Sequence, residues 1–291
     1  MTAEREIARV LDRAQVDGWL HVVDVDGGVE VAVGADTPVA LASAFKLVVL
    51  VALYREADAG VLDLRERLMV AAAARTPGVT GLAALRDDAD LSLRDLAQLM
   101  ITVSDNAAAD AVLDRVGLGA VVATVAELGL AHTSITQSCR DMHAALAEDL
   151  AGSGLSHAQA LGDPAALARL RVLDPATTNR STPRDMTTLL AAVWRDEAAG
   201  PHACAAMRRT LALQVWPHRL ASGFPADDVA VAGKTGTLPP LRSEVGLVEL
   251  PTGRRYAVAV FTRSRRRAAT DPGADAAIGE AARIAVDSLG P

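Results

Sequence analysis

Strand-forming runs lie near both ends of the 291-residue chain, and helical patterns fill most of the sequence between them. Residues 18–25 and 29–33 are rich in strand formers and are separated by Asp-Gly-Gly, a sequence typical of a hairpin turn. Further runs of this kind cover residues 229–232, 244–250 and 255–263. This arrangement predicts an α/β (α+β) fold in which both termini contribute to one five-stranded antiparallel sheet.

Helical patterns occupy residues 43–213 and also both ends of the chain, at 3–16 and 273–289. We expect the terminal helices to cover one face of the sheet and the central helices the other. The central helices are predicted at 43–58, 92–102, 107–116, 120–128, 141–150, 164–172, 183–196 and 202–214. The predicted organisation is an α/β domain from 1–62 and 214–291, an inserted all-α domain from 63–213, and an active site in the cleft between them.

The charge balance and the cysteine and histidine spacings exclude several classes of function. The chain has 29 basic and 36 acidic residues, a formal net charge of −7, whereas proteins that coat nucleic acid need a basic surface. The basic cluster at 263–267 has no interleaved aromatic residues and is interpreted as a solvated loop. Cys139, Cys204 and the six histidines lack metal-ligand spacing, so we expect no metal and no cofactor.

No segment of the sequence has the pattern of a secretory signal or a membrane span. Met1 leads directly into an amphipathic helical pattern instead of a basic start followed by an apolar core. The longest apolar run, 39–54, has 16 residues and contains a lysine, whereas a span needs ~20 residues. We therefore expect a cytoplasmic protein that does not bind membranes.

Only two of the 29 basic residues are lysines, Lys46 and Lys234, and the others are arginines. A buried lysine ammonium can lose its proton near neutral pH, which an arginine guanidinium effectively cannot do. The two lysines are therefore candidates for a role in proton transfer. The alternative is that they survived by chance, and their surroundings decide between the two.

Ser43 precedes Lys46 by three residues at the start of an apolar helical pattern. This spacing places the hydroxyl and the amine on one face of a helix. Unpaired N–H groups and the positive end of the helix dipole favour an oxyanion there. A neutral lysine one turn away would serve as the base for a serine nucleophile. The alternative is a serine N-cap beside an unrelated lysine.

Two further polar motifs could face the same cleft. Lys234-Thr235-Gly236-Thr237 follows an apolar strand, and Gly236 would let a ligand approach the backbone closely. The second motif, Ser104-Asp105-Asn106, lies at the break between two helical patterns. Its alternative interpretation is an ordinary helix cap, because these residue types are favoured there. Each motif alone is a weak signal.

Taken together and in this order, the three motifs resemble those of class A β-lactamases and penicillin-binding proteins, over nearly the whole chain. Arg242-Ser243-Glu244 is similar to the segment that follows the third motif in that family. Residues 179–183 resemble the end of its Ω loop. The resemblance implies an α/β sheet with an inserted helical domain, which agrees with the pattern of predicted elements.

The residues and the resemblance imply the same mechanism. Ser43 would attack a carbonyl with Lys46 as its base, and Ser104 would relay a proton to the leaving group. Asn106 would hold Lys46 and a substrate amide, and the backbone N–H groups of Ser43 and Thr237 would stabilise the oxyanion. A cationic, hydroxyl-lined end suited to a substrate carboxylate would comprise Lys234, Thr235, Gly236, Thr237 and Arg242.

The chain departs from the family at the residue that activates water. Class A β-lactamases use an Ω-loop glutamate, and here no glutamate occurs between Glu148 and Glu197. Asp174, followed by Pro175, stands where that glutamate is expected, in a shortened loop after a long segment at 130–172. Asp174 is either a water base of shorter reach or only part of a turn.

Three functions remain open. The first is a serine hydrolase or acyltransferase that forms an acyl-enzyme at Ser43 with a carboxylate-bearing amide, lactam or ester, and deacylates slowly. The second is a β-lactamase in which Asp174 activates water. The third is a binding or sensing module without turnover. The expected partner is a small molecule in each case, and the sequence leaves the oligomeric state open.

Overall fold

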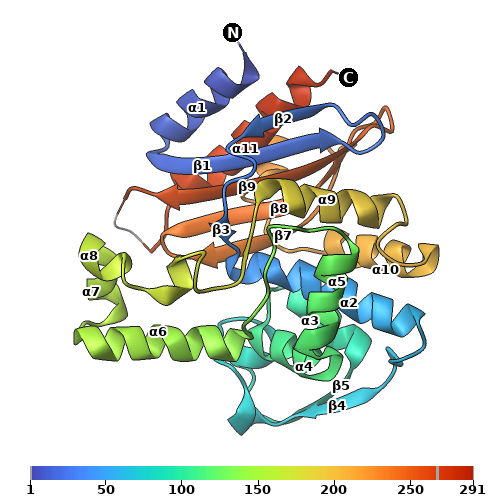
Figure 1. The fold of residues 1–291 in the computed structure, drawn as a ribbon, viewed down its shortest axis with the longest axis vertical. Coiled ribbons are helices and arrows are strands. Elements are labelled where there is room, and N and C mark those ends of the chain that lie inside the picture. Colours follow the sequence, from blue (N-terminus) through green and yellow to red (C-terminus); the bar gives the residue numbers. More distant parts are fainter. Residues whose placement is uncertain (1, 267–268, 291) are drawn as a thin grey trace.

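The computed structural model describes residues 2–266 and 269–290 and is built around one five-stranded sheet. The strand order is β2-β1-β9-β8-β7, and every neighbouring pair is antiparallel. Pairing of β1 with β9 joins the two ends of the chain, which lie close together in Figure 1. The predicted sheet is confirmed. Its strands are β1 (Val16–Asp24), β2 (Glu30–Val33), β7 (Ala230–Leu238), β8 (Leu241–Glu249) and β9 (Arg255–Ser264).

Alternate residues of β9 belong to two hydrophobic cores, one on each face of the sheet. Val258 and Val260 pack with α1 (Ala3–Arg13) and α11 (Pro272–Ser288), as the sequence predicts for the terminal helices. Ala259 and Phe261 point to the opposite face, because successive side chains of a strand alternate. That face is covered by α2 (Lys46–Asp58), α9 (Pro183–Trp194) and α10 (Pro201–Ala212) (Figure 1).

Helix α2 lies at the centre of the helical part of the molecule. Residues 46–54 are all buried, which accounts for the long apolar run in the sequence. Around α2 pack α3 (Leu93–Thr102), α4 (Asn106–Val116) and α5 (Leu118–Glu127), and α6 (Cys139–Ser153) packs against α4. Within the described part of the chain, no helix combines the length and apolar character needed to cross a membrane.

The segment 63–213 is not wholly helical. It contains the antiparallel pair β4 (Arg67–Val70) and β5 (Ala89–Ser92), and also β6 (Arg180–Ser181), which pairs with β3 (Val39–Ala40). Strands of two to four residues are too short to produce a recognisable alternation, and their pairing depends on distant partners. The boundaries proposed at 62/63 and 213/214 stay a prediction.

Two other elements differ from their predicted bounds by more than three residues. The helix predicted at 164–172 consists of α8 (Pro164–Leu167) and the 3-10 turn η4 (Arg171–Leu173), after a separate α7 (His157–Gly162). The strand predicted at 229–232 continues to Leu238, so the Lys-Thr-Gly-Thr motif lies within β7. Pairing with β8 extends the strand beyond its apolar residues.

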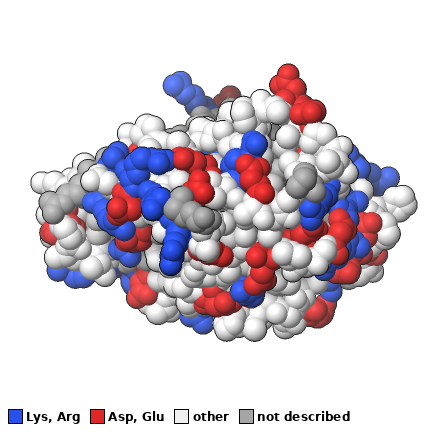
Figure 2. Space-filling model, turned by 90° about the horizontal axis from the view of Figure 1, so that it is seen from above, with Lys and Arg blue, Asp and Glu red and all other residues white. Residues whose placement is uncertain are grey.

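Opposite charges are interspersed on the face shown in Figure 2, which views the molecule from above. Several ion pairs join distant parts of the chain, including Arg13 with Glu280 and Arg265 with Asp12. These pairs are solvent-exposed, so each contributes at most about 1 kcal/mol to stability. The stability of the fold therefore depends mainly on the two cores.

We predict that Gly279→Ala destabilises the protein, contrary to the usual effect of alanine in a helix. An alanine Cβ at this position of α11 would lie 2.4 Å from the carbonyl oxygen of Arg219 and 2.6 Å from the nitrogen of Gly223. Such overpacking costs about 1–3 kcal/mol, which exceeds the gain of about 1 kcal/mol from helix propensity. Urea unfolding measures the change.

The control is Gly152→Ala in α6, where an added Cβ meets no atom within 4 Å. This variant should be as stable as the wild type or slightly more stable. Equal effects of the two substitutions would contradict the close packing of α11 against η5 (Leu220–Gly223).

Candidate active site

A cavity of about 640 Å³ brings together residues from all three sequence motifs. Ser43 comes from η1 (Ala42–Phe45), Ser104 and Asn106 from the α3–α4 junction, and Thr235 and Thr237 from β7. The other residues that line the cavity are Pro77, Gly78, Val79, Thr80, Val103, His143, Trp216, His218 and Arg219.

The backbone is strained at two positions of this site. Ala42, directly before Ser43, has φ 45°, and Ser104 has φ 59°. Left-handed φ values are uncommon for residues other than glycine, cost about 1–3 kcal/mol each, and persist only where the surroundings hold them. Such strain is typical of functional sites, and both residues lie next to or within the motifs.

Gly236 allows β7 to pass directly against η1. A Cβ at this position would lie 2.7 Å from the carbonyl oxygen of Leu41 and 2.5 Å from Ser243 Oγ. Any side chain here would therefore push the strand away from Ser43. The close approach explains how Thr237 and Ser43 come to line the same cavity.

Lys46 is fully buried, and its Nζ donates two short hydrogen bonds. The acceptors are the carbonyl oxygen of Ser104 and Asn106 Oδ1, each at 2.8 Å, with Asp105 O at 3.4 Å and Ser104 Oγ at 3.5 Å. Burial lowers the pKa of Lys46. Within the described residues, no hydrogen bond joins Lys46 to the Ser43 hydroxyl.

Lys234 reaches Ser104 from β7. Its Nζ donates to Ser104 Oγ at 2.9 Å and to the carbonyl oxygen of Thr235 at 2.7 Å. Burial holds the pKa of Lys234 well below its usual range, and the charges of Lys46 and Arg219 lower it further. The hydroxyl of Ser104 therefore lies between two buried amines, each of which can exist without its proton.

The helix-cap interpretation of Ser104-Asp105-Asn106 applies to its middle residue. Asp105 is the N-cap of α4 and accepts hydrogen bonds from the N–H groups of Ala107 and Ala108. Because Asp105 performs the capping, the side chains of Ser104 and Asn106 are available to the cavity.

Arg242 does not point into this cavity. It lies opposite Thr237 in the β7–β8 register, so its place on the sheet agrees with the sequence. Its guanidinium, however, donates to the carbonyl oxygen of Ala269 and lies 3.6 Å from Asp275, and the residue lines a different cavity. The structure therefore does not bring Arg242 to this cavity, because the carbonyl oxygen of Ala269 holds its guanidinium elsewhere.

Among the described residues that line the cavity, Arg219 is the arginine that contacts Thr237. It is buried, pairs with Asp275, and donates from Nη2 to Thr237 Oγ1 at 2.7 Å and from Nη1 to the carbonyl oxygen of Gly236 at 2.9 Å. It precedes η5 and belongs to no motif. Nothing in the sequence distinguishes it from the other arginines.

Asp174 is exposed and forms a turn. Its Oδ1 accepts a hydrogen bond from the N–H of Ala176 at 2.9 Å, and its carbonyl oxygen accepts one from Thr177. Ser43 lines two cavities, and Asp174 is not among the described residues that line them. These contacts favour the turn interpretation over the role of a water base.

The second of these cavities measures about 90 Å³ and lies between Ser43 and α6. It is lined by Ala42, Ser43, Asn106, Cys139, Met142, His143, Leu146, Val172, Thr237 and Leu238. Sequence reasoning missed His143, because a single histidine in a helical pattern carries no signal. The long segment at 130–172 thus contributes one wall of the site.

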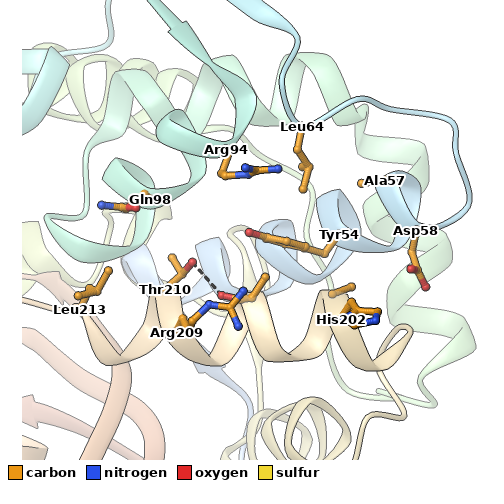
Figure 3. A pocket seen from close by; sticks show the side chains of 12 residues that line it. Tyr54, Ala57, Asp58, Leu64, Arg94, Gln98, His202, Arg209, Thr210 and Leu213 are labelled. Carbon is orange, nitrogen blue, oxygen red and sulfur yellow. Dashed lines mark hydrogen bonds between the residues drawn. The ribbon is translucent and has the colours of Figure 1, made fainter.

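Another cavity, of about 550 Å³, lies between α2, α3 and α10. Figure 3 shows the ring of Tyr54 in the middle, with Arg94 on one side and Arg209 on the other. The hydroxyl of Thr210 donates to the carbonyl oxygen of Ala206, and no lysine lines the cavity among the residues described. We therefore place the candidate active site at Ser43.

Comparisons with known proteins concern the family and the fold of the chain. The model of the "Beta-lactamase enzyme family" matches residues 2–289. The curated "Beta-lactamase regulatory protein BlaB" of Streptomyces cacaoi is 33% identical over 301 residues, covering 98% of this chain and 96% of that protein.

Solved structures include a β-lactamase from Sphaerobacter thermophilus. It is 28% identical, with a TM-score of 0.79 and coverage of 98% of this chain and 97% of that one. PBP-A is 24% identical, with a TM-score of 0.79 and coverage of 99% and 95%, and at this identity the likeness concerns the fold alone.

We predict that Glu244 makes stability fall as the pH rises toward neutrality. Its carboxylate accepts hydrogen bonds from the N–H of Leu220 at 2.8 Å and from Gln214 Nε2 at 2.6 Å, and burial raises its pKa to about 7. The unfolded chain releases this proton near its ordinary value of 4.5. The folded form therefore binds the proton more tightly, and ionisation opposes folding between these two pH values.

The test compares Glu244→Gln with the wild type in urea unfolding at pH 5 and pH 8. The variant cannot ionise, so its stability relative to the wild type should increase with pH, by at most about 3 kcal/mol. Glu249→Gln, at the exposed end of the same strand, is the control. A constant difference between Glu244→Gln and the wild type would contradict the prediction.

Proposed function

The chain belongs to the beta-lactamase enzyme family, and on this premise we propose that it is a serine hydrolase or acyltransferase. Ser43 would form an acyl-enzyme with a small amide, lactam or ester that carries a carboxylate. The observation that carries the proposal is that both lysines of the chain, far apart in sequence, donate hydrogen bonds to Ser104 beside Ser43.

In the acylation step, Ser43 Oγ transfers its proton to the Lys46 amine and bonds to the substrate carbonyl carbon. The backbone N–H groups of Ser43 and Thr237 stabilise the oxyanion, a contribution of about 3–4 kcal/mol for each donor in other hydrolases. Ser104 then passes a proton to the leaving group. Its position between the two buried amines supports this role.

The β7 side of the cavity binds the substrate carboxylate. Arg219 provides the cation there, together with the hydroxyls of Thr235 and Thr237, and Lys234 lies behind them with its Nζ on the carbonyl oxygen of Thr235. Charge-assisted hydrogen bonds to a carboxylate are about twice as strong as neutral ones. Asn106, held by Lys46, donates its amide hydrogen to the substrate carbonyl.

A second candidate is a binding or sensing module that acylates without rapid turnover. The regulatory name of the relative from Streptomyces cacaoi supports it, as does the lack of a carboxylate among the described residues that line the two cavities around Ser43. A β-lactamase that depends on Asp174 has less support, because that residue forms an exposed turn. The cytoplasmic location stays a prediction.

Intact-protein mass spectrometry after mixing with benzylpenicillin or p-nitrophenyl acetate tests these alternatives. We expect an acyl adduct on Ser43 that is absent in Ser43→Ala. Lys46→Arg should slow acylation by about 100-fold or more, because a guanidinium keeps a cation but cannot accept the proton.

Each other outcome has a distinct meaning. Undiminished acylation by Lys46→Arg would exclude the lysine as the base. A persistent adduct would indicate slow deacylation, as expected of a slow hydrolase or of a sensor, whereas rapid consumption of the donor without an adduct would favour a β-lactamase. Neither adduct nor turnover with either donor would contradict the proposed acyl-enzyme.

We predict that Arg219→Gln and Arg242→Gln differ in their effect on acylation. Loss of the Arg219 guanidinium should slow acylation by benzylpenicillin by about 10- to 100-fold, because it removes a hydrogen bond from a charged group to the carboxylate. Arg242 also contacts Asp275 and is equally buried, so Arg242→Gln controls for damage to the fold. Stopped-flow acylation kinetics measure both variants.

The neutral donor p-nitrophenyl acetate provides a further control. Since it carries no carboxylate, its acylation rate should be nearly the same in Arg219→Gln as in the wild type. Equal slowing with both donors would show that Arg219 supports the fold of the site instead of binding the carboxylate.

A further inference from the structure

Hydrolysis of an acyl-enzyme needs a group that takes a proton from water, close to the acylated serine. The described residues around Ser43 offer few such groups. The smaller cavity, of about 90 Å³, is large enough for water, which occupies about 30 Å³ per molecule in the liquid. Its titratable lining residues are His143 and Cys139, and none of its described lining residues is a carboxylic acid.

Helix α6 holds His143 against this cavity. Cys139, Met142, His143 and Leu146 all line it, at the i, i+3, i+4 and i+7 spacing of one helix face. The helix begins with a capping box formed by Ser138 and Asp141, and it packs against α4, which carries Asn106. The position of the imidazole is therefore defined by a capped and packed helix.

The hydrogen bonds of Asn106 determine which nitrogen of His143 has a free lone pair. Asn106 Oδ1 accepts from Lys46 at 2.8 Å, and its Nδ2 donates to the carbonyl oxygen of Pro77 at 2.9 Å. The amide is thereby oriented, and its Nδ2, 3.3 Å from His143 Nε2, is the donor in that contact. His143 Nε2 is the acceptor, so the neutral imidazole carries its proton on Nδ1.

Burial favours the neutral form of His143 near pH 7, because it lowers the pKa of the imidazole. Asp110 from α4 acts in the opposite direction, and the Lys46 ammonium from α2, where it is protonated, lowers the pKa as well. The two acidic side chains nearest in sequence on α6, Asp141 and Glu148, are engaged by Ser138 and by Arg171.

We propose that His143 is the general base that activates water for hydrolysis of the Ser43 acyl-enzyme. This inference rests on the proposed function. In the free protein, the N–H of Asn106 occupies the lone pair of His143 Nε2. When the carbonyl group of a substrate amide accepts that N–H, the lone pair becomes available to a water molecule in the smaller cavity. Substrate binding thereby frees the base.

The step balances without any other reactant. A water O–H bond breaks, its proton bonds to His143 Nε2, and the water oxygen bonds to the acyl carbon. The tetrahedral intermediate collapses as the bond between that carbon and Ser43 Oγ breaks. The proton on His143 passes to Oγ, which regenerates the serine hydroxyl and the neutral imidazole and releases a carboxylic acid.

The other titratable groups near Ser43 fit this role less well. Burial raises the pKa of the Cys139 thiol to about 11, so it stays protonated and cannot accept a proton. His218 lines only the larger cavity, next to the ring of Trp216. Lys46 does not line the smaller cavity, according to the residues described there.

The test measures deacylation of the benzylpenicillin adduct between pH 5 and pH 8.5, after excess penicillin is removed, by intact-protein mass spectrometry. The main variant is His143→Gln, since glutamine can still accept the hydrogen bond from Asn106 but is not a base. His132→Gln, at an exposed position outside both cavities, is the control.

We expect wild-type deacylation to rise with pH until His143 is fully neutral and then to level off. In His143→Gln, deacylation should be about 100-fold slower or more and should lose this pH dependence, while the acylation rate changes less than threefold. Added imidazole should partly restore deacylation in His143→Ala. The His132→Gln control should behave like the wild type.

Several results would overturn the inference while leaving the proposed function intact. They are deacylation of His143→Gln at the wild-type rate, a wild-type rate independent of pH, or loss of deacylation in His218→Gln instead. Parallel loss of acylation and deacylation would mean that His143 only positions Asn106. If the wild type forms no adduct and shows no turnover, the proposed function itself fails, and the role of His143 fails with it.

Discussion

The site depends on two lysine amines that are buried completely on either side of one serine hydroxyl. Burying an ammonium away from water is costly unless hydrogen bonds compensate it or the group loses its proton. The carbonyl oxygens of Ser104 and Thr235 and the amide of Asn106 supply those hydrogen bonds. The same burial lowers the pKa of both lysines. Desolvation therefore favours the neutral amines, which can accept a proton.

The sheet and α2 bring these amines together. Lys46 begins the buried helix α2, which packs against the sheet face that Ala259 and Phe261 form. Lys234 lies on β7, the edge strand of the sheet. Because Gly236 has no side chain, this edge strand can lie against η1 and Ser43. A change in the packing of α2 on the sheet would therefore move Ser43 and Lys46 together relative to Lys234.

The residues proposed for acylation lie on other elements than the residue proposed for hydrolysis. The former come from η1, the α3–α4 junction and β7. The group suited to accept a proton from water lies on α6, within the long segment at 130–172. A protein of this kind can keep its acylation residues while α6 alters the lifetime of the adduct. Such a separation is compatible with either a hydrolase or a sensor.

Local patterns in the sequence were sufficient to predict the sheet and the buried helix and to identify the three motifs. Hairpin turns, apolar periodicity and the spacing between Ser43 and Lys46 are properties of neighbouring residues, so they can be read without a structure. Gly236 likewise predicts a close approach to the backbone, because glycine has no side chain, but the sequence does not indicate which segment approaches it. The rarity of lysine in an arginine-rich chain identified both amines.

Only the tertiary structure decided which further polar side chains belong to the site. Asp275 on α11 pairs with both Arg219 and Arg242, but only Arg219 contacts Thr237, because the carbonyl oxygen of Ala269 holds the guanidinium of Arg242 away. His143 reaches Asn106 from a helix far along the chain, whereas Asp174 ends in an exposed turn. The direction and burial of a long polar side chain depend on partners from distant elements, and that information is absent from the local sequence.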